Sequence, residues 1–141
     1  MIMKILSTIL LTLLIVLGAC TSPQVSPDPF VRVSNGRLTV NGKPYYYIGT
    51  NFWYGAILGS QGQGGNRERL LRELDYLKAL GINNLRVLVG ADGKDGIPTK
   101  AEPALQVEAG VYNDTIFDGL DFFLSELDKR DMYAVLFLNN S

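Results

Sequence analysis

The apolar and polar residues follow different patterns in three successive parts of the chain. The first twenty residues hold a nearly unbroken apolar run from Ile5 to Leu17, preceded by one charged side chain, Lys4. Residues 21–29 hold three prolines and two serines, a composition typical of an extended tether. From Phe30 onward, apolar residues recur with the periods of strands and helices. The expected divisions are a leader at 1–19, a tether at 20–29 and a folded body at 30–141.

The leader has the features of a secretory signal peptide. A basic start, a short apolar run and small residues before a cleavage point are typical of such peptides. The run of about 13 residues is short for a helix that crosses a bilayer. The segment Leu17-Gly18-Ala19-Cys20 resembles the bacterial lipoprotein signal, in which the cysteine receives lipid and becomes the mature N-terminus. We therefore predict lipidation of Cys20; the alternative is an ordinary signal peptide with an incidental cysteine.

Lipid on Cys20 would make the membrane a partner of this protein, because acyl chains bury their methylene groups in the bilayer. The predicted location is the bacterial cell envelope, with the protein anchored in the outer membrane and facing either the periplasm or the exterior. Thr21 follows the cysteine, so the aspartate that would suggest retention at the inner membrane is absent.

The body begins with a pattern typical of short strands joined by tight turns. Glycine follows asparagine in both turns, at Asn35-Gly36 and at Asn41-Gly42, where a backbone with positive φ is needed. The expected strands are Phe30–Val33, Leu38–Val40 and Tyr45–Ile48, the last of which runs into Gly49-Thr50-Asn51-Phe52-Trp53.

Two amphipathic helices are expected after these strands. The first begins at the N-cap Asn66 and ends before Gly81, a residue typical of the position after a helix. The second is expected over Thr115–Arg130, and the glycine-rich segment Gly55–Gly65 is expected to be a loop. The apolar stripe of the first helix is Leu70, Leu71, Leu74, Leu77 and Leu80. That of the second is Ile116, Leu120, Phe123, Leu124 and Leu127.

Two apolar runs, Ile82–Val89 and Tyr133–Leu138, have the composition of strands buried on both faces. A long segment, Gly90–Asn113, separates the first run from the second helix and is expected to be a functional loop. Helix-length crossovers between buried strands imply parallel pairing. The predicted fold class is therefore α/β.

Composition excludes several kinds of chemistry. The chain has no histidine and one cysteine, so it cannot build a Ser-His-Asp triad, an imidazole metal site or a multi-thiolate zinc site. The 13 basic and 14 acidic residues nearly cancel, which argues against a nucleic-acid partner. We predict no metal and no cofactor.

The chain is short for the fold that its pattern implies. Two helices and the first strands cannot cover both faces of a parallel sheet, and a (β/α)₈ barrel needs about 250 residues. We therefore expect the chain to be the N-terminal part of a longer protein. The predicted architecture is a TIM barrel of which the hairpin, the first three parallel strands and two helices are present.

Candidate binding residues stand where the predicted parallel strands end, because active sites of such barrels form at that edge. Amides offer neutral donors and acceptors to sugar hydroxyls, and an aromatic ring can stack on a pyranose. The candidates are Asn51, Trp53, Asn139 and Asn140. The alternatives are a core position for the tryptophan and a turn or helix cap for the last two asparagines.

Arg86 interrupts an apolar run, where an unpaired guanidinium would be costly. Alternation places it with Leu88, opposite Leu85 and Val87. If its face lines the interior of a barrel, Arg86 would meet a carboxylate near the active site and keep it ionised. The alternative is a structural ion pair with a nearby acid.

Three segments together resemble the opening third of bacterial family 5 glycoside hydrolases. They are Gly49-Thr50-Asn51-Phe52-Trp53, Asn83-Asn84-Leu85-Arg86-Val87-Leu88-Val89 and Val135-Leu136-Phe137-Leu138-Asn139-Asn140-Ser141. Further segments are most similar to the β-mannanase branch of that family. They are Glu102-Pro103-Ala104-Leu105-Gln106, Gly110-Val111-Tyr112-Asn113-Asp114 and Lys129-Arg130-Asp131-Met132.

The resemblance implies a retaining endo-β-1,4-mannanase that uses two glutamates, with mannan-type polysaccharide as substrate. In the family the acid/base follows the fourth barrel strand and the nucleophile ends the seventh. Both positions lie beyond the C-terminus of this sequence, so no catalytic residue is assigned and the chain alone is expected to be inactive. Arg86 matches the arginine of the second strand that orients the nucleophile.

The acids that are present have less specific settings. Asp92 follows a strand and could touch substrate, but a solvated loop acid is the simpler interpretation. The glutamates expected on helix surfaces or in the long loop are Glu68, Glu73, Glu102, Glu108 and Glu126. Two alternatives to the mannanase stay open: a family 5 β-1,4-glucanase, and a surface lipoprotein that binds carbohydrate without cutting it.

Overall fold

The computed structural model describes residues 28–96 and 101–138, in two compact units, the first ending in the sequence at Tyr45 and the second beginning at Tyr46. Each unit is described by itself. The predicted leader, Cys20 and almost all of the tether lie outside the described residues, as do Asn139 and Asn140.

The first unit is a small antiparallel sheet of three strands. They are β1 (Arg32–Ser34), β2 (Arg37–Val40) and β3 (Lys43–Pro44). Positive φ angles of 50° at Asn35 and 73° at Gly36 form the turn between the first two strands, as the sequence predicts.

The third predicted strand is wrong at its beginning, because residues 45–48 are not a strand and only the continuation into Gly49–Asn51 forms one. The Asn83 side chain accepts a hydrogen bond from the Ile48 amide at 2.9 Å and donates one to the Tyr46 carbonyl at 3.1 Å. The next strand therefore begins later, as β4 (Gly49–Asn51) in the second unit. The Ile48 carbonyl also accepts from the backbone amides of Asn83 and Asn84, so this segment is bound there by one side chain and two backbone amides.

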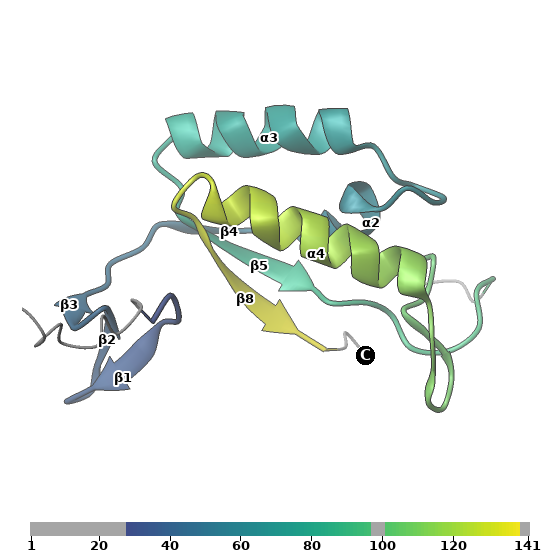
Figure 1. The fold of residues 1–141 in the computed structure, drawn as a ribbon, viewed down its shortest axis with the longest axis horizontal. Coiled ribbons are helices and arrows are strands. Elements are labelled where there is room, and N and C mark those ends of the chain that lie inside the picture. Colours follow the sequence, from purple (N-terminus) through teal and green to yellow (C-terminus); the bar gives the residue numbers. More distant parts are fainter. Residues whose placement is uncertain (1–27, 97–100, 139–141) are drawn as a thin grey trace, which may run out of the picture. The chain divides into compact units, whose positions relative to one another are not determined.

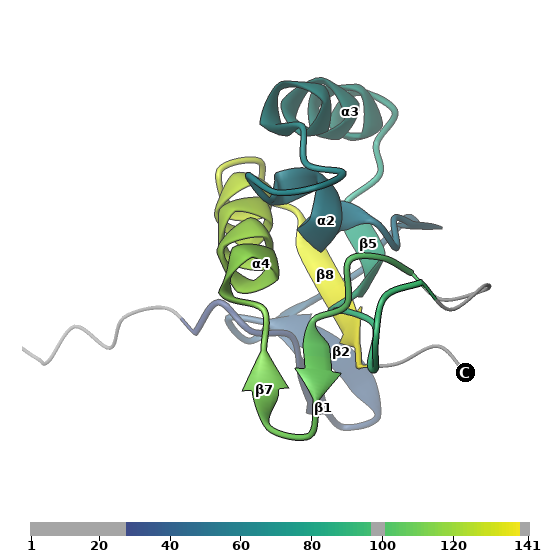
Figure 2. The same ribbon diagram turned by 90° about the vertical axis from the view of Figure 1, so that its right-hand side faces the viewer.

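The second unit is a parallel β-sheet with its helices on one face (Figures 1 and 2). The sheet order is β4, β5 (Asn84–Leu88) and β8 (Tyr133–Phe137). The helices are α2 (Gly55–Gly59), α3 (Arg67–Ala79) and α4 (Asp114–Asp128). The predicted alternation of parallel strands and helices is confirmed. None of the helices within the described residues has the length and apolar content that a membrane crossing requires.

The two long helices begin and end where local signals place them. The Asn66 side chain caps α3 by accepting from the Arg69 amide at 2.9 Å, and Gly81 follows that helix with a φ of 82°. Asn113 caps α4 in the same way through the Thr115 amide at 3.1 Å. The predicted cap and the predicted terminal glycine of the first helix are both confirmed.

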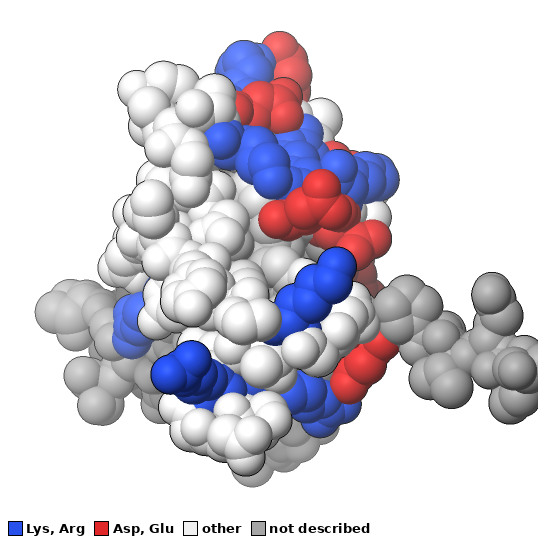
Figure 3. Space-filling model, turned by 90° about the vertical axis from the view of Figure 1, so that its left-hand side faces the viewer, with Lys and Arg blue, Asp and Glu red and all other residues white. Residues whose placement is uncertain are grey.

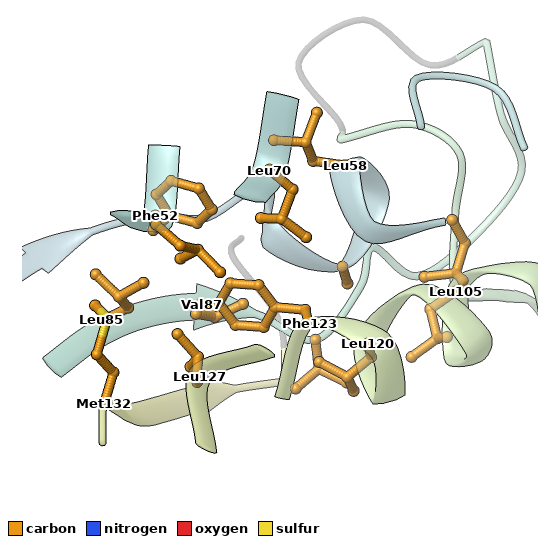
Figure 4. Close-up of a cluster of buried hydrophobic side chains, with 14 residues drawn as sticks. Phe52, Leu58, Leu70, Leu85, Val87, Leu105, Leu120, Phe123, Leu127 and Met132 are labelled. Carbon is orange, nitrogen blue, oxygen red and sulfur yellow. The ribbon is translucent and has the colours of Figure 1, made fainter. Parts of the chain in front are cut away.

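The core lies between the helices and the covered face of the sheet. Figure 4 shows Leu85 and Val87 of β5 among side chains from the helices, and both are fully buried. Leu70 and Leu74 of α3 and Phe123 of α4 are fully buried as well. The predicted stripe of the first helix is wrong at its end, because Leu80 is the C-cap and is 57% exposed.

The helix α2 is absent from the sequence prediction, which placed a loop there. Its glycines allow two backbones to meet, since a Cβ on Gly59 would lie 2.3 Å from the carbonyl oxygen of Gly119 in α4. A Cβ on Gly119 would lie 2.2 Å from the Ala56 carbonyl oxygen. Tertiary packing therefore overrides the low helix propensity of glycine.

The long segment after β5 is partly ordered by a second, two-stranded hairpin. Its strands are β6 (Gln106–Glu108) and β7 (Val111–Tyr112). Leu105 is buried and belongs to the core, and it leaves no room for a Cβ on Gly90. The later part of the predicted loop therefore packs on the core through Leu105.

Ion pairs join α3 to the end of α4, and basic and acidic side chains are interleaved over the upper part of the face in Figure 3. Arg130, which follows the end of α4, contacts Asp75 of α3 at 2.7 Å and Glu126 of α4 at 2.7 Å. Lys129 also pairs with Glu126, which is 6% exposed. Hydrogen bonds from Lys129 and then Arg130 hold the pKa of Glu126 below its ordinary value.

Replacing Glu126 with glutamine should destabilise the intact protein by about 1–3 kcal/mol at neutral pH, since charge-assisted hydrogen bonds are lost. A lowered pKa in the folded state means that the carboxylate stabilises the fold above its unfolded pKa. That contribution is lost as pH falls below about 4.3.

Urea unfolding at a series of pH values should show that the difference in unfolding free energy between E126Q and the parent becomes smaller in acid. E108Q is the control, at an exposed site; a difference for E126Q that is constant with pH would contradict the ion-pair account.

Candidate functional site

The face of the sheet opposite the helices carries a cluster of side chains from all three strands. Asn51 of β4 pairs in register with Arg86 of β5, and Arg86 pairs with Val135 of β8. Residues paired in register point to the same face of a sheet. Asn51 and Arg86 are exposed, and Val135 is 53% exposed, so this face is open within the described residues.

Arg86 is the centre of this cluster. Its Nη1 donates to the Asn51 side-chain oxygen at 3.3 Å, and its guanidinium carbon lies 3.6 Å from the centre of the Phe137 ring. The ring supports the guanidinium by a cation–π contact, and the amide orients one of its nitrogens. Three strands therefore hold one cation in place at the open face.

No ion pair of Arg86 is present within residues 28–96 and 101–138. The alternative interpretation, a structural pair with a nearby acid, is therefore not found in the described part of the chain. The strand tolerates a charged residue because Arg86 is exposed, not because it is paired with an acid. Leu85 and Val87 point to the core, and Arg86 points away from it.

The structure places Trp53 apart from this cluster. The indole is 45% exposed and meets Tyr54 edge-on, with ring centres 5.5 Å apart. The tryptophan lines a hollow of about 370 Å³ together with residues of α2, α3 and the segment that connects them. The other lining residues are Tyr54, Ile57, Leu58, Gly64 and Arg69. The interpretation of Trp53 as a core aromatic is wrong, and its role as a sugar contact stays a prediction.

A hydrogen-bonded network closes one wall of that hollow. The Tyr54 hydroxyl donates to Glu73 at 2.8 Å, and Arg69 donates to the other carboxylate oxygen at 2.6 Å. Burial, followed by the hydrogen bond with Glu73, raises the pKa of Tyr54, so the phenol stays protonated. Both oxygens of Glu73 are engaged, which fits its exclusion as a catalytic acid.

The acids of the segment after β5 bind that segment's own backbone and amides. Asp92 accepts from the Gln106 side chain at 2.9 Å, and Asp95 accepts from the Ala104 amide at 2.8 Å. Glu102 accepts from the Gly96 amide. These contacts tie the segment to itself, and a contact of Asp92 with substrate stays a prediction.

The cluster at the open face can position charge but cannot cut a bond by itself. Arg86 offers only hydrogen-bond donors, and Asn51 offers a neutral amide, so neither side chain is a nucleophile or a carboxylic acid. No group of three or more acidic, cysteine or histidine side chains that could hold a metal ion occurs among the described residues. The arrangement suits a guanidinium that orients a carboxylate or a polar ligand above the sheet.

The sequence pattern predicts Asn51 and Arg86 as site residues but does not predict their neighbour Phe137. The missing information was the register of β5 with β8, in which Leu88 pairs with Phe137 and so brings the ring to the face of Arg86. Alternation within β5 gave the face of Arg86 but not its neighbours on the adjoining strand.

Comparison with known proteins gives one matching family. The model described as "GH family 5 beta-mannosidase-like" matches residues 28–141. Two curated relatives are plant enzymes. Mannan endo-1,4-beta-mannosidase 5 of Solanum lycopersicum is 32% identical over 113 residues, which is 79% of this chain and 25% of that protein. Mannan endo-1,4-beta-mannosidase 1 of Oryza sativa subsp. japonica is 34% identical over 110 residues, or 77% of this chain and 23% of that protein.

A solved structure of a family 5 enzyme is also similar to this chain. The glycoside hydrolase family 5 mannosidase from Rhizomucor miehei superposes with a TM-score of 0.72 at 36% sequence identity, covering 77% of this chain and 27% of that one. A variant of that enzyme is known in complex with mannosyl-fructose. The chain thus spans about a quarter of the length of the relatives it matches.

Proposed function

Because the chain belongs to the β-mannosidase-like family 5 glycoside hydrolases, we propose that the complete protein cleaves β-1,4-mannan at internal bonds. The observation that most supports this proposal is the family match over residues 28–141. The curated relatives reported above are named mannan endo-1,4-β-mannosidases. The open face with Arg86, Asn51 and Phe137 supports it, since a guanidinium held on the inner face of barrel strands can orient a catalytic carboxylate.

The proposed mechanism is retaining and uses two glutamates from strands later in the barrel. One protonates the leaving oxygen and then activates water, while the other attacks the sugar from the opposite side, and the two carboxyl groups stand about 5–5.5 Å apart. Arg86 favours the ionised form of the nucleophile by charge and hydrogen bonding. None of the described acids is offered for either role, so we propose that residues 1–141 alone are inactive.

The proposed location is the bacterial cell envelope, with Cys20 carrying the lipid anchor. The support is the order of a basic start, an apolar run and a small-residue cleavage segment that ends in the chain's one cysteine. Radiolabelled palmitate should enter the complete protein and be absent from the C20S variant. An unlabelled parent would leave an ordinary signal peptide as the better interpretation.

The substrate is tested by comparing mannan with carboxymethylcellulose. The complete protein should release reducing ends from mannan, and glucan cleavage in its place would favour the family 5 β-1,4-glucanase. A non-catalytic carbohydrate-binding lipoprotein is the other alternative. The reading frame after Ser141 distinguishes it, since the hydrolase requires an Asn-Glu pair after the next strand, whereas a stop codon at that point would favour binding alone.

An exo-acting β-mannosidase is the second candidate, favoured by the description of the family model and by the Rhizomucor miehei mannosidase. Viscosity separates the two modes of attack, because internal cuts shorten long chains at once. Endo action predicts a steep fall in mannan viscosity with few reducing ends formed. Mannose release with nearly constant viscosity would establish the second candidate.

A further inference from the structure

The contact between Arg86 and Phe137 sets the orientation of the guanidinium plane. The central carbon of the guanidinium lies 3.6 Å from the centre of the ring, which is about the contact distance of two carbon atoms. An edge-on approach would place a nitrogen between that carbon and the ring, and it would hold the two groups further apart. The guanidinium therefore lies nearly flat on the ring.

Phe137 stands at the edge of the sheet where active sites of parallel barrels form. It is the last residue of β8, and its carbonyl accepts from the Val89 amide at 3.0 Å, just beyond the end of β5. Arg86 pairs in register with Val135, so Phe137 lies two residues nearer the carboxyl ends of the strands and on the same face. Contact with the ring therefore directs the Arg86 side chain toward that edge.

Asn51 restrains the guanidinium in a second direction. Its side-chain oxygen accepts from Nη1 at 3.3 Å, which limits rotation of the group within the plane that the ring sets. This bond uses one of the five N–H groups of Arg86. A carboxylate accepts two parallel hydrogen bonds from a guanidinium only when it lies in the same plane. The orientation of that plane therefore decides where a carboxylate must stand to be bound.

We propose that Phe137 is a positioning residue of the mannan hydrolase, because its ring sets the plane in which Arg86 meets the catalytic carboxylate. This inference rests on the proposed function and adds to it a role for an apolar residue of β8. Phe137 acts through Arg86 and does not need to touch the sugar. A leucine of similar size would fill the space, but it has neither a flat surface nor a π face, so the guanidinium could tilt.

The test compares F137L and F137Y in the complete protein, with and without R86A. F137L should lower kcat on mannan about tenfold and change KM by less than about twofold, since a cation–π contact is lost. F137Y keeps the ring and should stay within about threefold of the parent. In the R86A background, F137L should change kcat by less than about twofold, because no guanidinium is left to orient.

The matched control is F122L, which makes the same change at a second cation–π contact. The guanidinium carbon of Arg67 in α3 lies 4.0 Å from the centre of the Phe122 ring in α4, away from the open face of the sheet. F122L should keep kcat within about twofold even if its melting temperature falls. A loss of kcat as large as that of F137L would overturn the proposal, since altered packing would then explain both variants.

The contact also has a spectroscopic signature that does not depend on catalysis. The proton on Nε of Arg86 lies over the face of the ring, so its NMR signal should be shifted upfield. The signal is identified by its absence from R86A. It should move downfield in F137L and stay in place in F137Y, while the signal of the exposed Arg72 is unchanged in both.

Three results would overturn the role of Phe137 and leave the proposed function standing. They are a parental kcat in F137L, an equal loss with and without Arg86, and an Arg86 signal that does not move in F137L. Failure of the folded parent to cleave mannan would instead overturn the proposed function, and the role of Phe137 in it.

Discussion

Replacing Arg86 with alanine in the complete protein should lower kcat on mannan by about two to three orders of magnitude, with a much smaller change in KM. The guanidinium is held at the open face by Asn51 and by the ring of Phe137, and no described acid neutralises it. In the proposed mechanism it keeps the nucleophilic carboxylate ionised and aimed. Its loss should therefore also move the acidic limb of the pH–rate profile to higher pH, because the carboxylate would take up a proton more readily.

Two variants separate positioning from stability. R86K keeps the charge and loses the planar fork, so it should recover part of the rate and part of the shift in pH profile. R72A removes an exposed arginine that pairs with Glu68 on α3, and its rate should equal that of the parent. An R86A variant with an unchanged rate and an unchanged melting temperature would refute the role given to this residue.

Replacing Gly119 with alanine should destabilise the protein by about 3 kcal/mol, because the added methyl group overpacks a contact between two backbones. The new Cβ would lie 2.2 Å from the Ala56 carbonyl oxygen and 2.6 Å from the Ser60 nitrogen. Neither atom belongs to a flexible side chain, so α2 would have to move away from α4. The gain in helix propensity from glycine to alanine is about 1 kcal/mol and is too small to offset this.

Chemical unfolding of the intact protein measures the effect. D121A is the control, at an exposed position two residues further along the same helix, and it should change stability by less than about 0.5 kcal/mol. A G119A variant as stable as D121A would show that the close approach of α2 and α4 is wrong.

Local signals in the sequence were sufficient for the two long helices and for the hairpin. Asn66 and Gly81 mark the ends of α3 through hydrogen bonding and positive φ, which depend on neighbouring residues alone. The helix α2 could not be predicted in this way, since its close packing at Gly59 depends on Gly119, which is distant in the sequence. The strand predicted over Tyr45–Ile48 is absent for a similar reason, because the Ile48 amide donates its hydrogen bond to Asn83, which is distant in the sequence.

The candidate site was predictable to the same extent. Arg86 was conspicuous as a charge in an apolar strand, and the period of two placed it on the face away from the core. The contact with Phe137 needed the pairing register of two parallel strands, and the placement of Trp53 in a separate hollow needed the course of α2. Neither is encoded by residues that are neighbours in the sequence.

The most direct test of the account is the anomeric form of the first product from mannotetraose, followed by proton NMR with the complete protein. A retaining hydrolase of β-1,4-mannan first yields the β-anomer, which then converts slowly to the equilibrium mixture in water. We expect the β-anomer signal to rise first, and to be lost in R86A. Initial release of the α-anomer, or no cleavage of the mannan oligosaccharide by an intact and folded protein, would contradict the account.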